Sequence, residues 1–251
     1  MQHRAAAGAD WPEGDTMSRY PGAEWVPWLY IGASGRPAFY RGGNLPSAVV
    51  LHIMEGYVST VRGWARTGYA EASWHFSIGR DGAVYQHLEL TDGGYHAGIT
   101  DARAAARPPV WPLWRGPGVN VNFYTIGIEH EGFSGPPFPE AQAAASRDLC
   151  RWLAATLGIP FDRDHFPPHA DIDLVNRPND FNMPIMREAH YRYLFEQEDE
   201  VTRAEFEEQQ KQILGLLWAD SIRNQQVEKL KADIVVLRKS IADHILTHEE
   251  E

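Results

Sequence analysis

His52, His169 and Asp180 are three side chains that together can hold a metal ion. His52 follows the apolar run Ser47–Leu51, whereas His169 and Asp180 lie far downstream. Two imidazoles and one carboxylate bind zinc at about 2.0–2.2 Å and leave the fourth position open, which is the arrangement of a catalytic rather than a structural site. Zinc held in this way makes a coordinated water acidic and polarises a carbonyl oxygen. If these side chains converge, the sequence predicts a metal-dependent hydrolase.

Hydrolysis at such a site also needs a general base close to the attacking water. Glu129 ends the segment Phe123–Glu129, whose β-branched and aromatic residues predict a strand. A strand there could lie beside the strand that ends at His52, so Glu129 is the first candidate for the base. Glu131 shares the face of Glu129 if the strand continues, which makes it the second candidate.

Other residues compete for each ligand position. The chain holds eleven histidines, and a lone histidine after an apolar strand is more often structural than a ligand. His165 is close enough to His169 to compete with it for the metal. Asp171 and Asp173 compete with Asp180 for the carboxylate position. Spacing alone does not choose among these residues.

The elements that must position these residues alternate along the chain. Strands are predicted over Ser47–His52, Trp74–Ile78, Ala83–Leu88 and Phe123–Glu129, and helices over Thr60–Arg66, Pro139–Leu157 and Pro184–Phe195. Asp81-Gly82 between two of the strands is a strong hairpin signal. Residues 100–120 are rich in proline and predict a long loop, which could border a substrate groove. Strands interleaved with helices indicate an α/β domain.

Composition excludes several classes of protein. The net charge of −11 argues against a nucleic-acid binder, which is normally basic. No segment approaches the roughly 18 apolar residues that a membrane span needs, so we expect no membrane insertion. The single cysteine, Cys150, excludes an intrachain disulfide. The first residues lack the apolar core of a secretory signal, so we expect the protein to be made in a cytoplasm.

Changes in composition divide the chain into three parts. Residues 1–24 predict a flexible arm, residues 25–195 the catalytic domain, and residues 196–251 a charged tail that forms a long amphipathic helix. In the tail, apolar residues are spaced by three and four: Val227, Leu230, Ile234, Leu237 and Ile241. This seam covers about two heptads, fewer than the three to four that make a coiled coil certain. The helix could therefore pack on its own domain or assemble a homo-oligomer through residues 213–246.

Five short segments carry a resemblance to a known family because they occur in a set order. They are Val49–His52, Ser73–Gly82, Gly94–Gly98, Asn122–Glu129 and Pro168–Ile172. In these segments the chain resembles the zinc-dependent N-acetylmuramoyl-L-alanine amidases of type 2. That family is related to the peptidoglycan recognition proteins and includes many phage endolysins. The resemblance covers roughly residues 45–195.

The resemblance implies a central mixed β-sheet flanked by helices, with zinc in a surface groove. It implies hydrolysis of the amide bond between N-acetylmuramic acid and L-alanine in bacterial peptidoglycan. Carried over by position, the metal ligands are His52, His169 and Asp180, and the catalytic glutamate is Glu129. The missing secretory signal then fits an endolysin of a phage or prophage, which a holin would release to the cell wall.

Other family positions predict contacts to the substrate. His75 and His96 match positions near the groove, with His96 the better candidate, and Trp74 stands where many relatives have a tyrosine. Relatives usually carry a lysine two positions before the last ligand, but Pro178 stands there. Arg177 can supply the cation for the oxyanion instead. These departures leave one alternative, a non-catalytic peptidoglycan-binding module that oligomerises through its C-terminal helix.

Overall fold

The computed structural model describes residues 19–32, 34–67, 72–135, 137–176 and 189–196. The chain divides into two units, residues 1–134 with 138–198, and residues 135–137 with 199–251. All elements named below belong to the first unit. Asp180, Arg177, most of the predicted arm and the predicted tail helix beyond residue 196 lie outside the described residues. Within the described residues, no helix combines the length and the apolar composition that crossing a membrane requires.

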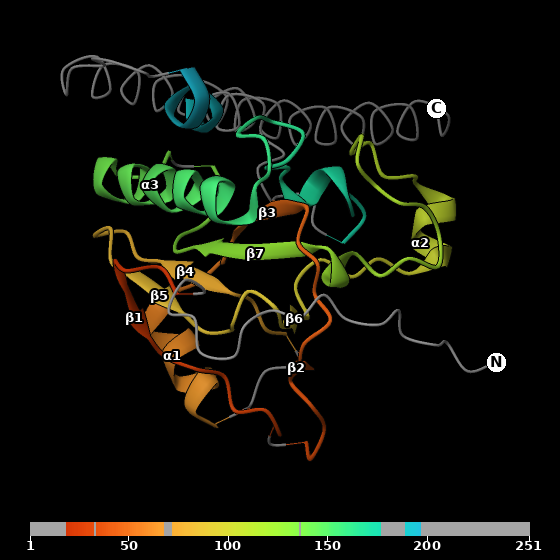
Figure 1. Cartoon of the computed structure of the whole chain (residues 1–251), viewed down its shortest axis with the longest axis horizontal. Coiled ribbons are helices and arrows are strands. Elements are labelled where there is room, and N and C mark those ends of the chain that lie inside the picture. The colour runs from red at the N-terminus through yellow and green to blue at the C-terminus, as the bar shows by residue number, and fades with distance from the viewer. Residues whose placement is uncertain (1–18, 33, 68–71, 136, 177–188, 197–251) are drawn as a thin grey trace, which may run out of the picture. The chain divides into compact units, whose positions relative to one another are not determined.

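A five-stranded mixed sheet forms the centre of the fold (Figure 1). The strand β7 (Thr125–His130) runs parallel to β3 (Ala48–Ile53) on one side and to β4 (Phe76–Ile78) on the other. β4 pairs antiparallel with β5 (Val84–Gln86), and the edge strand β1 (Ala23–Trp25) runs parallel to β5. This arrangement confirms the predicted α/β class with a mixed sheet. It also places residues 23 and 24, the end of the predicted arm, in a strand.

The inner strands owe their position to continuous apolar runs. All six residues of β3 are buried, as expected for a strand covered on both faces. His52 is the one ionisable residue in this strand. The turn between β4 and β5 contains Gly82, whose φ of 86° lies in the left-handed region that favours glycine. The predicted hairpin is therefore confirmed.

Helices cover both faces of the sheet, with α3 on one side and α1 on the other (Figure 1). The helix α3 (Glu140–Leu157) ends at Gly158, which has a φ of 66°, as the sequence predicts. Its residues Leu149 and Leu153 are fully buried. The helix α1 (Val58–Thr67) begins two residues before its predicted start. The helix predicted over 184–195 is described only from residue 189, where it is helical and ends in a π-helical turn, η4 (Arg192–Glu196).

Four short elements complete the domain, and the first two of them depart from the sequence prediction. The predicted loop 100–120 contains a helix, α2 (Asp101–Ala106), because the Thr100 hydroxyl caps an alanine-rich run by accepting a hydrogen bond from Arg103 N. The predicted strand 123–129 is preceded by a 3-10 turn, η2 (Val121–Phe123), so β7 starts at Thr125. A second small sheet pairs β2 (Phe39–Tyr40) with β6 (Gly93–Gly94).

Candidate metal centre

The register of two parallel strands brings His52 and Glu129 together. His52 of β3 lies directly opposite Glu129 of β7, so both side chains project from the same face of the sheet. His52 Nδ1 lies 3.9 Å from Glu129 Oε1, and the glutamate side chain keeps an exposed fraction of 14%. A buried imidazole and a half-buried carboxylate therefore meet at the ends of neighbouring strands.

His169 reaches the same place from a segment that runs beside β3. Val49 N donates to the carbonyl of His165 at 2.8 Å, and Leu51 N donates to the carbonyl of Pro167 at 2.9 Å. The chain then turns through η3 (His169–Asp171), which begins at the candidate ligand. The Nδ1 atoms of His52 and His169 lie 3.1 Å apart, and the ring centroids are 4.7 Å apart.

The spacing of these two imidazoles suits two ligands of a single metal ion. Two nitrogens bound to a tetrahedral zinc at about 2.0–2.1 Å lie roughly 3.3 Å apart. The observed spacing of 3.1 Å between the two Nδ1 atoms is close to that value. A bound metal would also be within reach of the Glu129 carboxylate, which lies beside the same Nδ1 of His52.

The described residues do not supply the third ligand. Among them, no group of three or more His, Cys, Asp or Glu side chains is placed to hold a metal ion. Asp173, which competes with Asp180 in the sequence, forms an ion pair with Arg103 at 2.9 Å. His165, the competitor of His169, is paired with Asp162 at 2.7 Å. Of the sequence candidates for the site, Asp180 and Arg177 lie outside the described residues.

His96 lies next to the metal pair, on the side of His52 away from His169. Its Nδ1 is 3.1 Å from His52 Nε2, and its Nε2 is 3.4 Å from Thr125 Oγ1. Burial, followed by the neighbouring imidazoles of His52, His75 and His169, lowers the pKa of His96 well below its ordinary value. The His96 ring is therefore neutral at physiological pH.

His75 belongs to the interior rather than to a substrate surface. The side chain is fully buried, its Nδ1 accepts a hydrogen bond from Gly127 N at 3.1 Å, and its Nε2 donates to the Asp92 carbonyl at 2.9 Å. Burial lowers the pKa of His75 to about 4, so the ring stays neutral. Both ring nitrogens are therefore hydrogen-bonded, one to Gly127 of β7 and the other to the turn at Asp92. This placement differs from the predicted substrate contact.

Trp74 is likewise a core residue in the structure. Its ring is 4% exposed, meets Trp28 edge to face at 5.3 Å, and donates from Nε1 to Ser77 Oγ at 2.8 Å. The ring joins a hydrophobic cluster with Val61 and Ala65 of α1. Trp74 is therefore not accessible for the substrate contact that the sequence predicts, because α1 packs over its ring.

We expect the substitution Trp74→Ala to lower the free energy of unfolding by about 3–5 kcal/mol, the range for large aromatic side chains in cores. Denaturant unfolding followed by circular dichroism measures this loss. Trp64→Ala is the matched control, because Trp64 of α1 is 36% exposed and its removal should change stability little. If the Trp74→Ala protein is stable but binds peptidoglycan more weakly, the hypothesis that Trp74 contacts the substrate would be supported after all.

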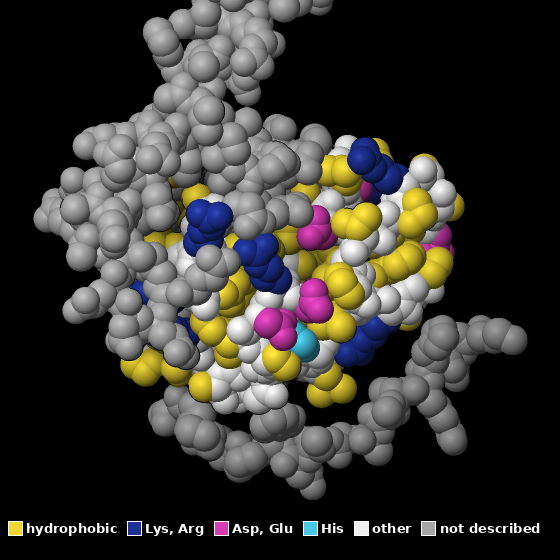
Figure 2. All heavy atoms as spheres, turned by 90° about the horizontal axis from the view of Figure 1, so that it is seen from above, with side chains coloured by type: hydrophobic (Ala, Val, Ile, Leu, Met, Phe, Trp, Pro, Cys, Tyr) yellow, Lys and Arg dark blue, Asp and Glu magenta, His cyan; other side chains and the backbone are white. Residues whose placement is uncertain are grey.

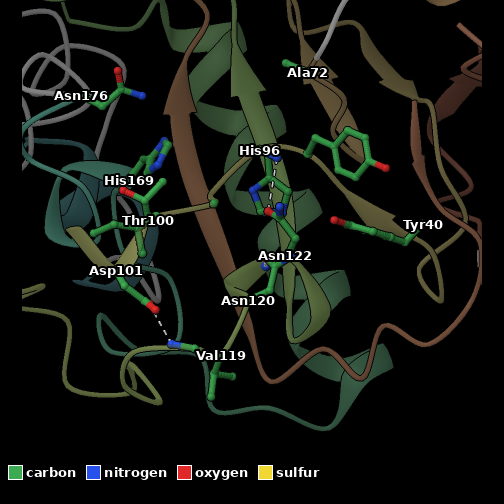
Figure 3. Close-up of a pocket in the computed structure, with 14 residues that line it drawn as sticks. Tyr40, Ala72, His96, Thr100, Asp101, Val119, Asn120, Asn122, His169 and Asn176 are labelled. Carbon is green, nitrogen blue, oxygen red and sulfur yellow. Dashed lines mark hydrogen bonds between the residues drawn. The ribbon is translucent and has the colours of Figure 1, made fainter. Parts of the chain in front are cut away.

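A groove of about 650 Å³ reaches His169 of the candidate metal pair, whereas His52 is not among its lining residues (Figure 3). His96 and His169 lie in its wall, with α2 and the loop 118–120 on one side and Tyr40 on the other. The residues that line it are Tyr40, Ala72, Tyr95, His96, Gly98, Ile99, Thr100, Asp101, Gly118, Val119, Asn120, Asn122, His169 and Asn176. Residues from 100–120 thus border a groove, as the sequence predicts. Tyr40, Tyr95 and Asn176 had no predicted role, because Tyr40 lies in the two-residue strand β2 and the other two lie outside any helix or strand, where no periodicity marks a residue.

Charged groups are dispersed on the face of the molecule that Figure 2 shows. Basic and acidic side chains alternate there with hydrophobic ones. In the coloured, described part of this face they form no continuous basic patch of the kind that binds nucleic acid.

Comparisons with known proteins agree on one family. A family model described as N-acetylmuramoyl-L-alanine amidase matches residues 42–183. The chain is 29% identical over 124 residues to N-acetylmuramoyl-L-alanine amidase A of Achromobacter lyticus, a match that covers 48% of this chain and 58% of that protein. The match thus spans less than two thirds of that relative.

Two solved structures are similar to this chain at low sequence identity. An endolysin N-acetylmuramoyl-L-alanine amidase from Clostridium intestinale is 20% identical, with a TM-score of 0.42 over 63% of this chain and 88% of that one. A mutant endolysin from Bacillus subtilis is 18% identical, with a TM-score of 0.47 over 68% of this chain and 99% of that one.

Proposed function

The chain belongs to the N-acetylmuramoyl-L-alanine amidase family, and we propose that it hydrolyses the amide bond between N-acetylmuramic acid and L-alanine of bacterial peptidoglycan with the help of zinc. The observation that carries this proposal is the meeting of His52, His169 and Glu129 beside a groove. All three residues lie within the part of the chain that the family model matches.

His52 and His169 would hold the zinc through Nδ1, since these two atoms face each other at 3.1 Å. Asp180 is the proposed third ligand, which leaves the fourth position open. When bound, zinc supplies an acidic water and a Lewis acid for the carbonyl oxygen of the substrate.

Glu129 serves as the general base and later as the general acid. Its carboxylate takes a proton from the attacking water as the new carbon–oxygen bond forms at the lactyl carbonyl. The same proton then passes to the nitrogen of L-alanine as the carbon–nitrogen bond breaks, so the carboxylate is regenerated. Arg177 is the proposed cation that stabilises the negative charge on the carbonyl oxygen.

The residues that line the groove suit a glycopeptide in their chemistry. Its wall combines the aromatic rings of Tyr40 and Tyr95 with the polar side chains of Asn120 and Asn176. Such a mixture of aromatic surface and a few polar groups is typical of ligand sites. Sugar rings can pack on the former, and peptide amides can bond to the latter.

The biological setting belongs to the proposal as well. We infer an endolysin of a phage or prophage that is made in a cytoplasm and reaches the cell wall through a holin. For residues 213–246 we propose a helix that assembles a homo-oligomer, with packing on its own domain as the alternative. Sedimentation of the full chain against a chain ending near Glu196 tests that assembly.

Purified full-length protein should release new L-alanine amino groups from isolated bacterial cell walls. A strong zinc chelator is expected to abolish this release, and added zinc should restore it, because the proposed chemistry depends on the metal. Amino groups are measured with an amine-reactive dye, and mass spectrometry identifies the released stem peptides. Zinc-loaded protein that binds cell walls but frees no amines would overturn the proposal in favour of a non-catalytic binding module.

A further inference from the structure

The ring of His96 stands between the candidate zinc ligand His52 and the hydroxyl of Thr125. We infer that His96 is a positioning residue, which holds His52 in the tautomer that carries its proton on Nε2 and turns the lone pair of Nδ1 toward the metal. This inference rests on the zinc site of the proposed function. It adds to the substrate contact that the sequence predicts for His96, which stays a prediction because His96 also lies in the wall of the groove.

The donors and acceptors in the chain of hydrogen bonds from the Val121 carbonyl to His52 follow from the Thr125 hydroxyl. The Thr125 hydroxyl donates to the Val121 carbonyl at 2.8 Å, so its single proton is used there. The same oxygen can then only accept from His96 Nε2, at the longer distance of 3.4 Å. A neutral imidazole has one donor and one acceptor, which makes His96 Nδ1 the acceptor.

His52 must therefore donate from Nε2 to His96 Nδ1, across the observed 3.1 Å. With its proton on Nε2, His52 presents the lone pair of Nδ1 on the opposite side of the ring. That side faces His169 Nδ1 at 3.1 Å and Glu129 Oε1 at 3.9 Å. The relay from Val121 through Thr125 and His96 thus assigns the tautomer that a zinc ligand needs.

The His96 ring packs directly against the backbone of Gly127. A Cβ atom placed on Gly127 would lie 2.6 Å from His96 Cγ and 2.8 Å from His96 Nδ1, so the ring occupies the space left by the missing side chain. The backbone is fixed as well, because Asn122 Oδ1 accepts from His96 N at 3.3 Å and from Ala97 N at 2.9 Å. Ring and backbone are therefore both fixed against β7 and η2.

Imidazole ¹⁵N spectra of the zinc-free full-length protein test the tautomer directly. We expect His52 to carry its proton on Nε2 in the wild type and in His96→Asn, whose Oδ1 can accept in place of Nδ1. In His96→Leu we expect this preference to be lost. Wild-type protein with His52 protonated on Nδ1 would contradict the relay, whatever the protein binds or cleaves.

Zinc affinity, measured by competition with a chelating dye, gives the second readout. His96→Leu should bind zinc about 10–100-fold more weakly than wild type, the usual cost of losing an outer hydrogen-bond partner of a zinc ligand. His96→Asn should recover most of the affinity. His87→Leu is the matched control, because His87 is also buried and doubly bonded but contacts Ser77 and Val26.

A second variant covers the case in which His96→Leu fails to fold. Thr125→Val keeps the shape of the side chain but removes the acceptor for His96 Nε2, and should also weaken zinc binding. Wild-type affinity in both a folded His96→Leu and Thr125→Val overturns the positioning role and leaves the proposed function intact. Failure of the wild type to take up zinc overturns the proposed function instead, and the imidazole spectra still decide the tautomer of His52.

Discussion

Replacing Glu129 with glutamine should lower the rate of amide hydrolysis by roughly 10²–10⁴-fold, the usual contribution of a general base. Glutamine keeps the size of the side chain but cannot take the proton from the attacking water. Zinc affinity should stay close to that of the wild type, since Glu129 Oε1 lies 3.9 Å from His52 Nδ1 and is not a proposed ligand. Amine release from cell walls and dye competition for zinc measure the two effects separately.

Glu131→Gln is the matched control for this experiment. The Glu131 carboxylate accepts hydrogen bonds from Val58 N at 3.3 Å and from Arg80 N at 2.9 Å, so it holds the start of α1 and the β4–β5 turn. Its replacement should lower the melting temperature but leave turnover of the folded protein unchanged. If Glu129→Gln keeps full activity, the assigned mechanism is wrong, and loss of activity in Glu131→Gln alone would transfer the role of base to Glu131.

The parts of the site that lie on strongly patterned strands could be predicted from the sequence. The apolar run before His52 predicts a strand that ends at a possible metal ligand. The β-branched run before Glu129 predicts a strand that ends at a possible general base. The structure confirms the two strands and shows them paired in parallel, which sets the two side chains opposite each other. A parallel register of this kind follows from neither strand alone, so the contact itself could only be a hypothesis.

The burial of Trp74 and His75 and the hydrogen-bond partners of His96 could not be predicted, because they depend on residues distant in the sequence. Trp74 and His75 precede β4, which lies between β5 and β7 and is enclosed on both faces. The partners of His96 come from β3 and β7, and no spacing in the sequence connects them. The short helix α2 was missed because its six residues are too few to show helical periodicity within a proline-rich stretch.

Replacing Asp180 with alanine should weaken zinc binding by more than about 100-fold and abolish amide hydrolysis. The loss should exceed the roughly 10–100-fold that is usual when a hydrogen-bond partner of a zinc ligand is removed, because Asp180 is itself a proposed ligand. In the proposed site, the two Nδ1 atoms at 3.1 Å would supply only two of the three protein ligands of a catalytic zinc. Asp171 and Asp173 are both described, yet neither forms a group with His52 and His169 that could hold a metal ion. The proposed site therefore takes its third donor from outside the described residues, and Asp180 lies within the stretch matched by the family model.

Asp171→Ala provides the matched comparison, because Asp171 is a carboxylate in the same turn as His169. We expect this variant to bind zinc and to release amines as the wild type does. Asp173 suits the comparison less well, since its removal would strip Arg103 of an ion pair at 2.9 Å and alter stability as well. Zinc titration of the two alanine variants under identical conditions separates the alternatives. If Asp171→Ala loses the metal while Asp180→Ala retains it, η3 supplies two ligands, His169 and Asp171, and must rearrange to bring the Asp171 carboxylate toward His52.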